Sequence, residues 1–300
     1  MSWLVLAFSG PLLWAVSFHL DKYLVERFFK ETSVAVLLVF TALIGLLMLP
    51  FILLYQPGVL ALPGTSILLI GFSGILYMSA MLFYLQALQT EEASVIAPLF
   101  QASPLFAYGL GYVFLGEALT KPQLLGGGAI VLGALLLSWQ GKGAPFKARL
   151  VALMLICTFT LAIASLIFKI FAIRDAFWST TFWTYAGEAV FGFAVLAVPS
   201  YGRQFVALFR RNRGALIAIN GSNELINLGG GLGTRYALVL APLSLVQAIG
   251  STTTLFVFLI GVVLSLFFPA LAREDLSARN LVLKGVAAIL VGIGVALVNR

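Results

Sequence analysis

The chain is a succession of apolar segments, separated by short polar turns, and each segment is about as long as a membrane-crossing helix. Such a helix needs about 20 predominantly apolar residues. Hydropathy and turn residues together predict ten spans, with an integral all-α membrane fold and no appended soluble domain. Their cores are 3–21, 33–54, 66–88, 93–115, 122–139, 149–172, 178–199, 214–238, 242–268 and 281–298.

Composition supports this class, because 61% of the residues are hydrophobic and 10% are charged. A soluble domain of this size could not cover so much apolar surface with so few charges. The net charge of +7 is carried mainly in short loops, so it indicates membrane topology and no nucleic-acid partner. Cys157 is the single cysteine, which excludes an intramolecular disulfide and a cysteine-built metal site. We expect no metal and no cofactor.

The sequence also contains an internal repeat with a shift of about 150 residues. We therefore divide the chain into two modules, residues 1–141 and 142–300, of five spans each. Because five is odd, the second module enters the membrane from the opposite side, which predicts two inverted-topology repeats. Such folds bind substrate near the bilayer midplane, between the repeats. The matched positions include Lys22 with Lys169, Pro50 with Pro199, Ala87 with Ala237, Ser94 with Ser244 and Gly111 with Gly261.

Four short motifs in residues 87–139 resemble the EamA module of the drug/metabolite transporter superfamily. They are Ala93-Ser94-Val95, Ser103-Pro104-Leu105, Leu115-Gly116-Glu117 and Gln123-Leu124-Leu125-Gly126. The second half departs from the pattern, since Arg273-Glu274-Asp275 stands where the first half has Gly-Glu. The resemblance implies a multi-pass transporter of the cell membrane that moves, and often exports, amino acids, other metabolites or drugs.

Lysine and arginine are distributed unevenly between the two ends of the predicted spans. Basic residues concentrate in the cytoplasmic loops of membrane proteins. The charges therefore predict that both termini lie outside, whereas ten-helix members of the resembling family usually have cytoplasmic termini. The rich end has Lys22, Arg27, Lys30, Lys142, Lys147, Arg149, Arg203, Arg210, Arg211, Arg213, Arg273, Arg279 and Lys284, and the other end has Lys121, Arg174, Arg235 and Arg300.

The eighth span has the most polar residues at membrane depth. Asn220, Asn223, Glu224 and Asn227 recur at helical spacing, so they share one face. Polar groups at this depth are costly unless they have a partner or line a watery cavity. We interpret the face as a substrate-binding or cavity-lining surface, and a hydrogen-bonded seam between helices is the alternative.

Charged residues of the sixth, seventh and eighth spans, and one at the end of the first, are candidates for coupling or for a charge pair. Burial disfavours the charged form of a carboxylate, so Glu188 and Glu224 could carry protons or pair with a substrate amine. A structural ion pair is the alternative for Glu188. Lys169 and its repeat mate Lys22 could face a carboxylate, or Lys169 could extend to the membrane surface.

Further cavity candidates come from the third, fourth and ninth spans. Tyr77 and Tyr84 share a face of the third span, which occupies the same place in its repeat as the eighth span. Gln101 lies on a polar face of the fourth span, and Gln247 lies on one of the ninth span. Aromatic surface in one repeat and amide or carboxylate groups in the other suit a small amphipathic organic solute.

These features favour a secondary transporter that works by alternating access between the repeats. The chain contains one histidine and one cysteine, and no HExxH or GxSxG motif, so we expect no enzyme. A lipid-handling or membrane assembly protein without solute flux is the alternative function. We expect a monomer, with a dimer as the alternative, because the duplicated module can complete a cavity within one chain.

Overall fold

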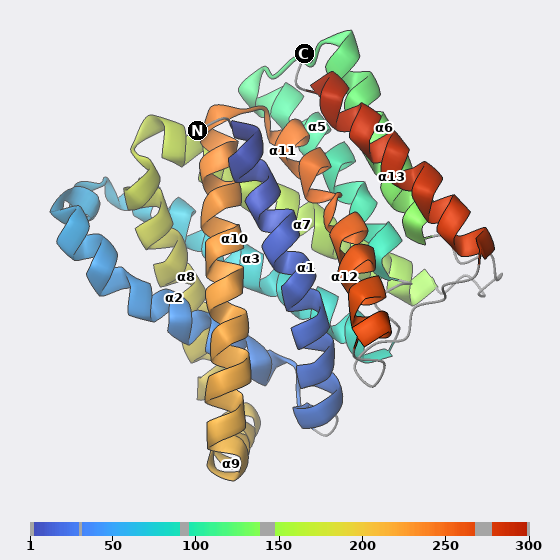
Figure 1. Ribbon diagram of the computed structural model, residues 1–300. Helices are drawn as coiled ribbons and strands as arrows, with labels where there is room; N and C mark the ends of the chain where they lie inside the picture. The colour runs from blue at the N-terminus through green and yellow to red at the C-terminus, as the bar shows by residue number, and fades with distance from the viewer. Residues whose placement is uncertain (1–2, 30–31, 91–95, 139–147, 268–277, 299–300) are drawn as a thin grey trace.

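The computed structural model describes residues 3–29, 32–90, 96–138, 148–267 and 278–298 (Figure 1). These ranges consist of helices and short turns and contain no β-strand. The helices of the first half are α1 (Trp3–Phe28), α2 (Ala35–Tyr55), η1 (Pro57–Ala61), α3 (Gly64–Thr90), η2 (Ala97–Ala102), α5 (Ser103–Leu115) and α6 (Lys121–Ser138). Those of the second half are α7 (Ala148–Arg174), α8 (Phe177–Ala197), α9 (Pro199–Ala215), η3 (Leu216–Asn220), α10 (Gly221–Leu240), α11 (Leu243–Gly250), α12 (Thr253–Phe267) and α13 (Ala278–Val298).

Several helices are long and apolar enough to cross a bilayer. Among the described residues five stretches meet this requirement, and a sixth does so if the bent pair of α8 and α9 is one span. The five are Trp3–Val25, Ala35–Tyr55, Gly64–Gln89, Ala148–Arg174 and Leu243–Val263. Helix α10 is not among them, since its polar face lowers its hydropathy. The predicted all-α membrane class is confirmed.

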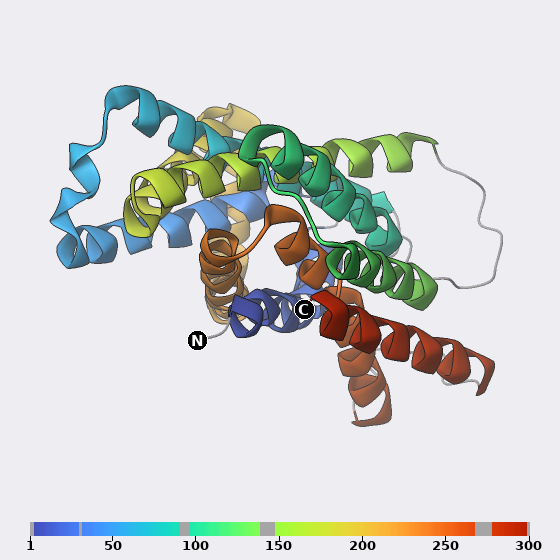
Figure 2. The same cartoon turned by 90° about the horizontal axis from the view of Figure 1, so that it is seen from above.

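The most extensive helix contacts join the first half of the chain to the second. Helix α6 packs on α13, α1 on α10, α2 on α8 and α3 on α7. Figure 2 shows α6 and α13 side by side at one edge of the molecule and α2 and α3 at the opposite edge. The two halves are therefore interleaved, and their boundary passes through the centre of the bundle.

Glycines allow two of these helix pairs to approach closely. A methyl group on Gly187 of α8 would overlap the backbone carbonyl of Gly71 on α3, and one on Gly74 would overlap the carbonyl of Thr184. On α6, a methyl group on Gly126 would lie 2.6 Å from the carbonyl oxygen of Gly294 on α13. Small residues at such crossings are typical of membrane helix pairs, because they let the backbones touch.

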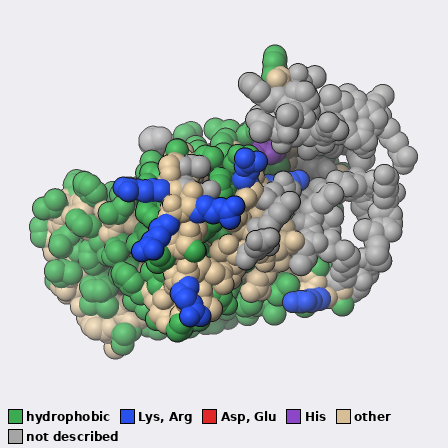
Figure 3. Space-filling model, turned by 90° about the horizontal axis from the view of Figure 1, so that it is seen from below, with side chains coloured by type: hydrophobic (Ala, Val, Ile, Leu, Met, Phe, Trp, Pro, Cys, Tyr) green, Lys and Arg blue, Asp and Glu red, His purple; other side chains and the backbone are tan. Residues whose placement is uncertain are grey.

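The end of the molecule opposite both termini is basic. Figure 1 places the two termini at one end, and Figure 3, seen from the other end, shows lysine and arginine side chains gathered there. The exposed basic residues of the first and second halves at this end include Lys22, Arg27, Arg203, Arg210, Arg211 and Arg213. The gathering of these residues at one end agrees with the uneven charge distribution of the sequence.

Part of the basic end is an additional helix that the hydropathy pattern did not predict. The sequence places residues 200–213 between two spans, whereas the structure forms α9, bent by 96° from α8. Phe205 packs against Phe40 of α2 with ring centroids 5.3 Å apart, and Leu208 is buried. With arginines on its exposed side, α9 is an amphipathic helix of the kind that lies along a membrane surface.

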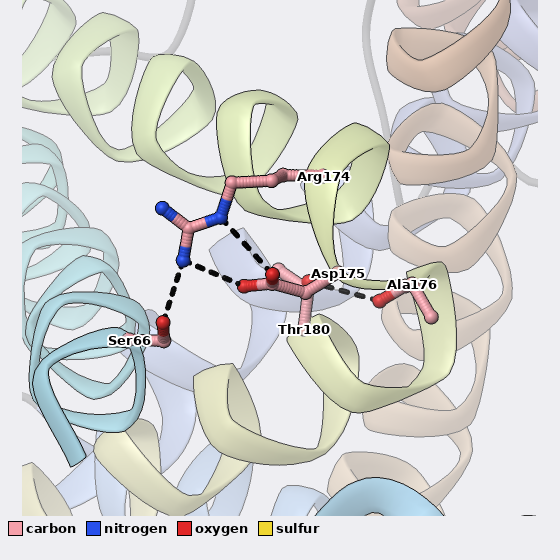
Figure 4. A network of polar contacts seen from close by, with 5 residues as sticks. All are labelled: Ser66, Arg174, Asp175, Ala176 and Thr180. Carbon is pink, nitrogen blue, oxygen red and sulfur yellow. Dashed lines mark hydrogen bonds and ion pairs between the residues drawn. The ribbon is translucent and has the colours of Figure 1, made fainter. Parts of the chain in front are cut away.

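A polar network fixes the turn between α7 and α8 at the other end (Figure 4). The Arg174 guanidinium donates to both carboxylate oxygens of Asp175 at 3.0 and 3.1 Å, and to the Ser66 hydroxyl of α3 at 2.6 Å. The Thr180 hydroxyl donates to the Ala176 carbonyl at 3.0 Å. Since the Arg174 side chain is 55% exposed, this network is peripheral and ties a loop to a neighbouring helix.

Candidate functional site

The polar face of α10 points across the boundary toward α1 and α2. The face begins at Asn220, the last residue of the π-helical segment η3, and Asn220, Asn223 and Glu224 are all buried. The Asn223 amide donates to the Asp21 carboxylate of α1 at 2.7 Å. The Thr41 hydroxyl of α2 donates to the Glu224 carboxylate at 2.8 Å. The face thus lies between the two halves of the chain.

An ion pair lies farther along the same helix. Arg235 of α10 donates to the Glu188 carboxylate of α8 at 2.6 Å, with 14% and 3% of the two side chains exposed. The guanidinium carbon lies 4.8 Å from the ring centroid of Tyr185, 5.6 Å from Phe168 and 5.7 Å from Tyr77. Three aromatic rings therefore surround the cation, and cation–π attraction is strongest where water is excluded.

The structure gives Arg235 a partner that the sequence analysis did not assign. The sequence counts this residue at the basic-poor end of the eighth span, and in the structure it lies within α10 and is paired with Glu188. The sequence contains a signal that Arg235 belongs to the polar face, since Arg235 follows Glu224 by eleven residues. Eleven residues are close to three helical turns, so the two side chains share a face. The other partners missed from the sequence are Asp21, Thr41 and Tyr185.

The two tyrosines of α3 occupy different positions in the site. Tyr77 is partly buried and lies close enough to Glu188, Glu224 and Arg235 to interact with all three electrostatically. Tyr84 is 5% exposed and packs against Phe18 and Phe100, with ring centroids 5.6 and 5.4 Å away. The tyrosines thus border two neighbouring parts of the polar region, one at the ion pair and one near the end of α1.

A second ion pair joins Lys169 of α7 to Glu117, in the turn between α5 and α6. The Lys169 ammonium also donates to the Ala241 carbonyl, and the Glu117 carboxylate accepts from the backbone N–H of Leu243 at 2.7 Å. The lysine is 4% exposed, so it does not extend to the membrane surface. Together these contacts tie the turn after α5 to α7 and to the first residue of α11.

We expect Glu117→Gln to destabilise the protein by about 1–3 kcal/mol, because Lys169 would lose the charged partner of a buried hydrogen bond. Thermal unfolding in detergent, followed by size-exclusion chromatography, measures the effect. Lys121→Met, at an exposed lysine of the following helix, is the control and should change stability by less than about 0.5 kcal/mol. Equal melting of both variants would show that the pair contributes nothing to stability.

The remaining predicted residues are not all brought together. Gln247 of α11 donates to the Ser165 hydroxyl and accepts from the Ser103 hydroxyl, both at 3.2 Å. Asn227 is partly buried on the Glu224 face. Lys22 is exposed, so its surroundings differ from those of its repeat mate Lys169. Gln101 lies in η2, and its side chain is outside the described part of the structure.

Several buried polar atoms near the boundary between the halves have no hydrogen-bond partner among the described residues. Native proteins pair nearly all buried polar groups, so unpaired ones call for an explanation such as a ligand or water. A hollow between α2 and α8 is lined by apolar side chains only and does not contain them. The unpaired atoms are Tyr84 Oη, Thr181 Oγ1, Asn220 Oδ1 and Nδ2, Asn223 Oδ1, Thr234 Oγ1 and Arg235 Nη1.

The arrangement offers charges, amides and aromatic rings without the features of a metal site. Among the described residues, no three histidine, cysteine, aspartate or glutamate side chains come together as metal ligands. Cys157 is buried and has no disulfide partner. Chemically, the region can bind a solute through ionic, amide and aromatic contacts, and its carboxylates can take up protons.

Comparison with known proteins assigns part of the chain to a family. Residues 1–139 match the EamA-like transporter family. An uncharacterized protein of Methanocaldococcus jannaschii is 29% identical over 96 residues, which are 32% of this chain and 70% of that protein. A protein of known crystal structure has 16% sequence identity and a TM-score of 0.69, over 99% of this chain and 95% of that chain. At that identity the structural similarity shows the fold alone.

Proposed function

We propose that this protein, which carries an EamA domain of the drug/metabolite transporter superfamily in residues 1–139, is a secondary transporter of small organic metabolites. The match of residues 1–139 to this family supports a multi-pass membrane transporter without enzymatic activity. Our proposal adds alternating access between two inverted repeats of five spans, in the cell membrane. Amino acids and amphipathic drugs are the substrates that we expect, and export is the direction.

The pattern of helix contacts supports the two-repeat arrangement. In the two-repeat scheme, α1 corresponds to α7 and α5 corresponds to α12. Exchanging each helix for its counterpart therefore turns the contact of α1 with α12 into the contact of α7 with α5, which is also present. Likewise, α3 with α8 becomes α10 with α2, and α6 with α13 maps onto itself. This exchange is what a pseudo-two-fold axis between the halves would produce. In this scheme α9 is an extra helix outside the ten spans.

The observation that carries the proposal is that buried polar contacts join the halves. Thr41 binds Glu224, Asp21 binds Asn223, Glu117 pairs with Lys169, and Ser103 binds Gln247. In each pair, one residue comes from each half. A carrier must open one side of such a boundary while it closes the other, so polar contacts that can break and re-form are suited to it. Tyr77, Asn220 and Asn227 complete the proposed substrate surface.

Glu224 is the residue that we propose for proton coupling. Glu188 has Arg235 as its partner, whereas Glu224 accepts from a neutral hydroxyl. Among the described residues, no lysine or arginine lies within ion-pair distance of Glu224. A buried carboxylate without a cation favours the protonated form, which allows it to exchange protons with the two sides of the membrane.

Counterflow in proteoliposomes tests the proposal, with a panel of amino acids, amines and nucleosides. We expect accumulation of at least one labelled solute against its unlabelled form. If the folded protein exchanged none of the solutes in the panel, this result would contradict a transporter and favour the lipid-handling or assembly function.

For Glu224→Gln, we expect solute exchange to persist while a pH gradient no longer drives uptake. The reason is that glutamine keeps the hydrogen bond from Thr41 but carries no proton. Flux with and without an imposed gradient measures the effect. Asp175→Asn is the matched control, because Asp175 belongs to the peripheral network of Figure 4. Gradient-driven flux in Glu224→Gln equal to that of the unchanged protein would show that coupling lies elsewhere.

A further inference from the structure

A distinct part of the polar region lies beside Glu224, where α1, α3 and α10 meet. Asp21 of α1 accepts from the Asn223 amide at 2.7 Å. Tyr84 of α3 packs on Phe18 with ring centroids 5.6 Å apart, and Phe18 precedes Asp21 by one helical turn. Asp21 and Phe18 are therefore neighbours on one face of α1, and Tyr84 lies against that face.

Three buried side chains at this place have polar atoms without a partner. The Asn223 amide uses its N–H on Asp21, and its oxygen is unpaired. The Tyr84 hydroxyl is also unpaired, and only 5% of the residue is exposed. Asn220 precedes Asn223 by one turn, is fully buried, and has neither amide atom paired. An amide oxygen and a hydroxyl are thus available near one carboxylate.

Aromatic rings form the apolar wall of the same place. The rings of Phe18, Tyr84 and Phe100 contact one another, with centroid distances of 5.6, 5.4 and 6.4 Å. Two of the contacts, at 66° and 81°, put ring edges against ring faces, and the third is tilted at 60°, so the three rings form one cluster. Aromatic faces beside a carboxylate are the surroundings in which proteins bind organic cations.

The Asp21 carboxylate makes the charge at this place negative. No lysine or arginine is paired with Asp21 or with Glu224, the proposed proton carrier, among the described residues. The neighbouring Lys22 is exposed. His19, two residues before Asp21, is directed to the Val257 carbonyl of α12 at 3.2 Å. Arg235 neutralises Glu188 and leaves these two carboxylates without a cation.

Of the ligands that a carboxylate can attract, an organic ammonium group satisfies the most of these atoms. An anion would be repelled by the Asp21 carboxylate. A proton would satisfy Asp21 but leave the Asn223 oxygen and the Tyr84 hydroxyl unpaired. A divalent metal is disfavoured, since no three acidic or histidine ligands come together among the described residues. An ammonium has up to three donors and an apolar stem that suits the aromatic wall.

Building on the proposed function, we infer that Asp21, Asn223 and Tyr84 form the subsite for the ammonium group of an amine substrate. Asp21 supplies the countercharge, Asn223 and Tyr84 supply acceptors, and Phe18 and Phe100 hold the adjoining carbon atoms. Among the substrates proposed above, this subsite favours amines, and the group that it recognises is a cationic nitrogen. Glu224 remains free to carry the coupling proton beside it.

Binding and counterflow with matched ligand pairs test this inference. The amines are phenethylamine and 3,3-dimethylbutylamine, and their neutral counterparts are 2-phenylethanol and 3,3-dimethylbutanol. The unchanged protein is compared with Asp21→Asn, Tyr84→Phe and the peripheral control Asp175→Asn, and each is checked for a monodisperse peak in size-exclusion chromatography. We expect the unchanged protein to bind at least one amine about tenfold or more tightly than its neutral counterpart, as hydrogen bonds to a charged group allow.

Asp21→Asn should abolish the preference for the amine and leave the affinity for the neutral compound unchanged. Tyr84→Phe should reduce the preference for the amine by a smaller factor. Equal affinities of the unchanged protein for both members of each pair would overturn the amine subsite. The same holds if Asp21→Asn keeps the preference. If amino acids or nucleosides still showed counterflow in these cases, the proposed transporter function would stand and only the amine subsite would fail. Absence of all counterflow would contradict both proposals.

Discussion

Gly187→Ala should reduce the stability of the bundle by about 3 kcal/mol or more, which is at the upper end of overpacking effects. The added methyl group would overlap the Gly71 carbonyl, and the next nearest atoms, at 2.7 and 2.9 Å, are also backbone atoms of Gly71. No side chain can rotate away to make room. Helices α3 and α8 must therefore separate, although they cross at the point where Gly74 would also collide with α8.

The effect should extend to the ion pair, because Glu188 follows Gly187 directly. A methyl group on Gly74 would lie 2.9 Å from the backbone nitrogen of Glu188, so the crossing determines where that carboxylate stands. Thermal unfolding in detergent measures the loss. Gly128→Ala is the control, since nothing lies within 4 Å of its added methyl group. Alanine in an open helical position should stabilise by up to about 1 kcal/mol. Identical melting of both variants would disprove the close crossing.

Arg235→Met should destabilise the protein by about 3–5 kcal/mol, because it leaves the Glu188 carboxylate buried without its cation. Only 3% of the Glu188 side chain is exposed, so water cannot replace the guanidinium. We also expect solute flux to fall below detection. Arg235→Lys should recover little, since a lysine ammonium does not stack as a planar group against Tyr77, Tyr185 and Phe168.

The double variant Arg235→Met with Glu188→Gln separates the pair from its surroundings. Removing both charges should recover most of the lost stability, because no unpaired buried charge remains. Arg213→Met is the matched control, because Arg213 is exposed in the last turn of α9. This substitution should leave stability nearly unchanged. A double variant as unstable as Arg235→Met alone would mean that ring stacking, and not the ion pair, determines the effect.

Much of the helical pattern could be predicted from the sequence, because apolar runs and turn residues mark where helices begin and end. The polar face of α10 was found by its helical spacing, and its members Asn220, Asn223 and Glu224 are buried. Helix α9 was missed because its apolar and basic residues average to low hydropathy, although they separate onto two sides when the segment is helical.

The partners of the polar residues could not be predicted, because they come from distant parts of the chain. Asp21 and Asn223 are separated by 202 residues, and Thr41 and Glu224 by 183. Local spacing identifies which residues share a helix face, but not which other helix that face meets. For the same reason Lys22 and Lys169 looked equivalent as repeat mates, while the fold buries one and exposes the other.

The pairing of α6 with α13 has a consequence for how the protein is made. About 140 residues separate the end of α6 from the start of α13. At about 5–20 residues per second, translation of that stretch takes on the order of ten seconds. During this time Gly126 and Gly133 of α6 lack the helix that covers them in the finished protein. The newly inserted first half must therefore wait in the bilayer with an open glycine face, which is a surface for chaperones of membrane insertion or for premature association with other chains.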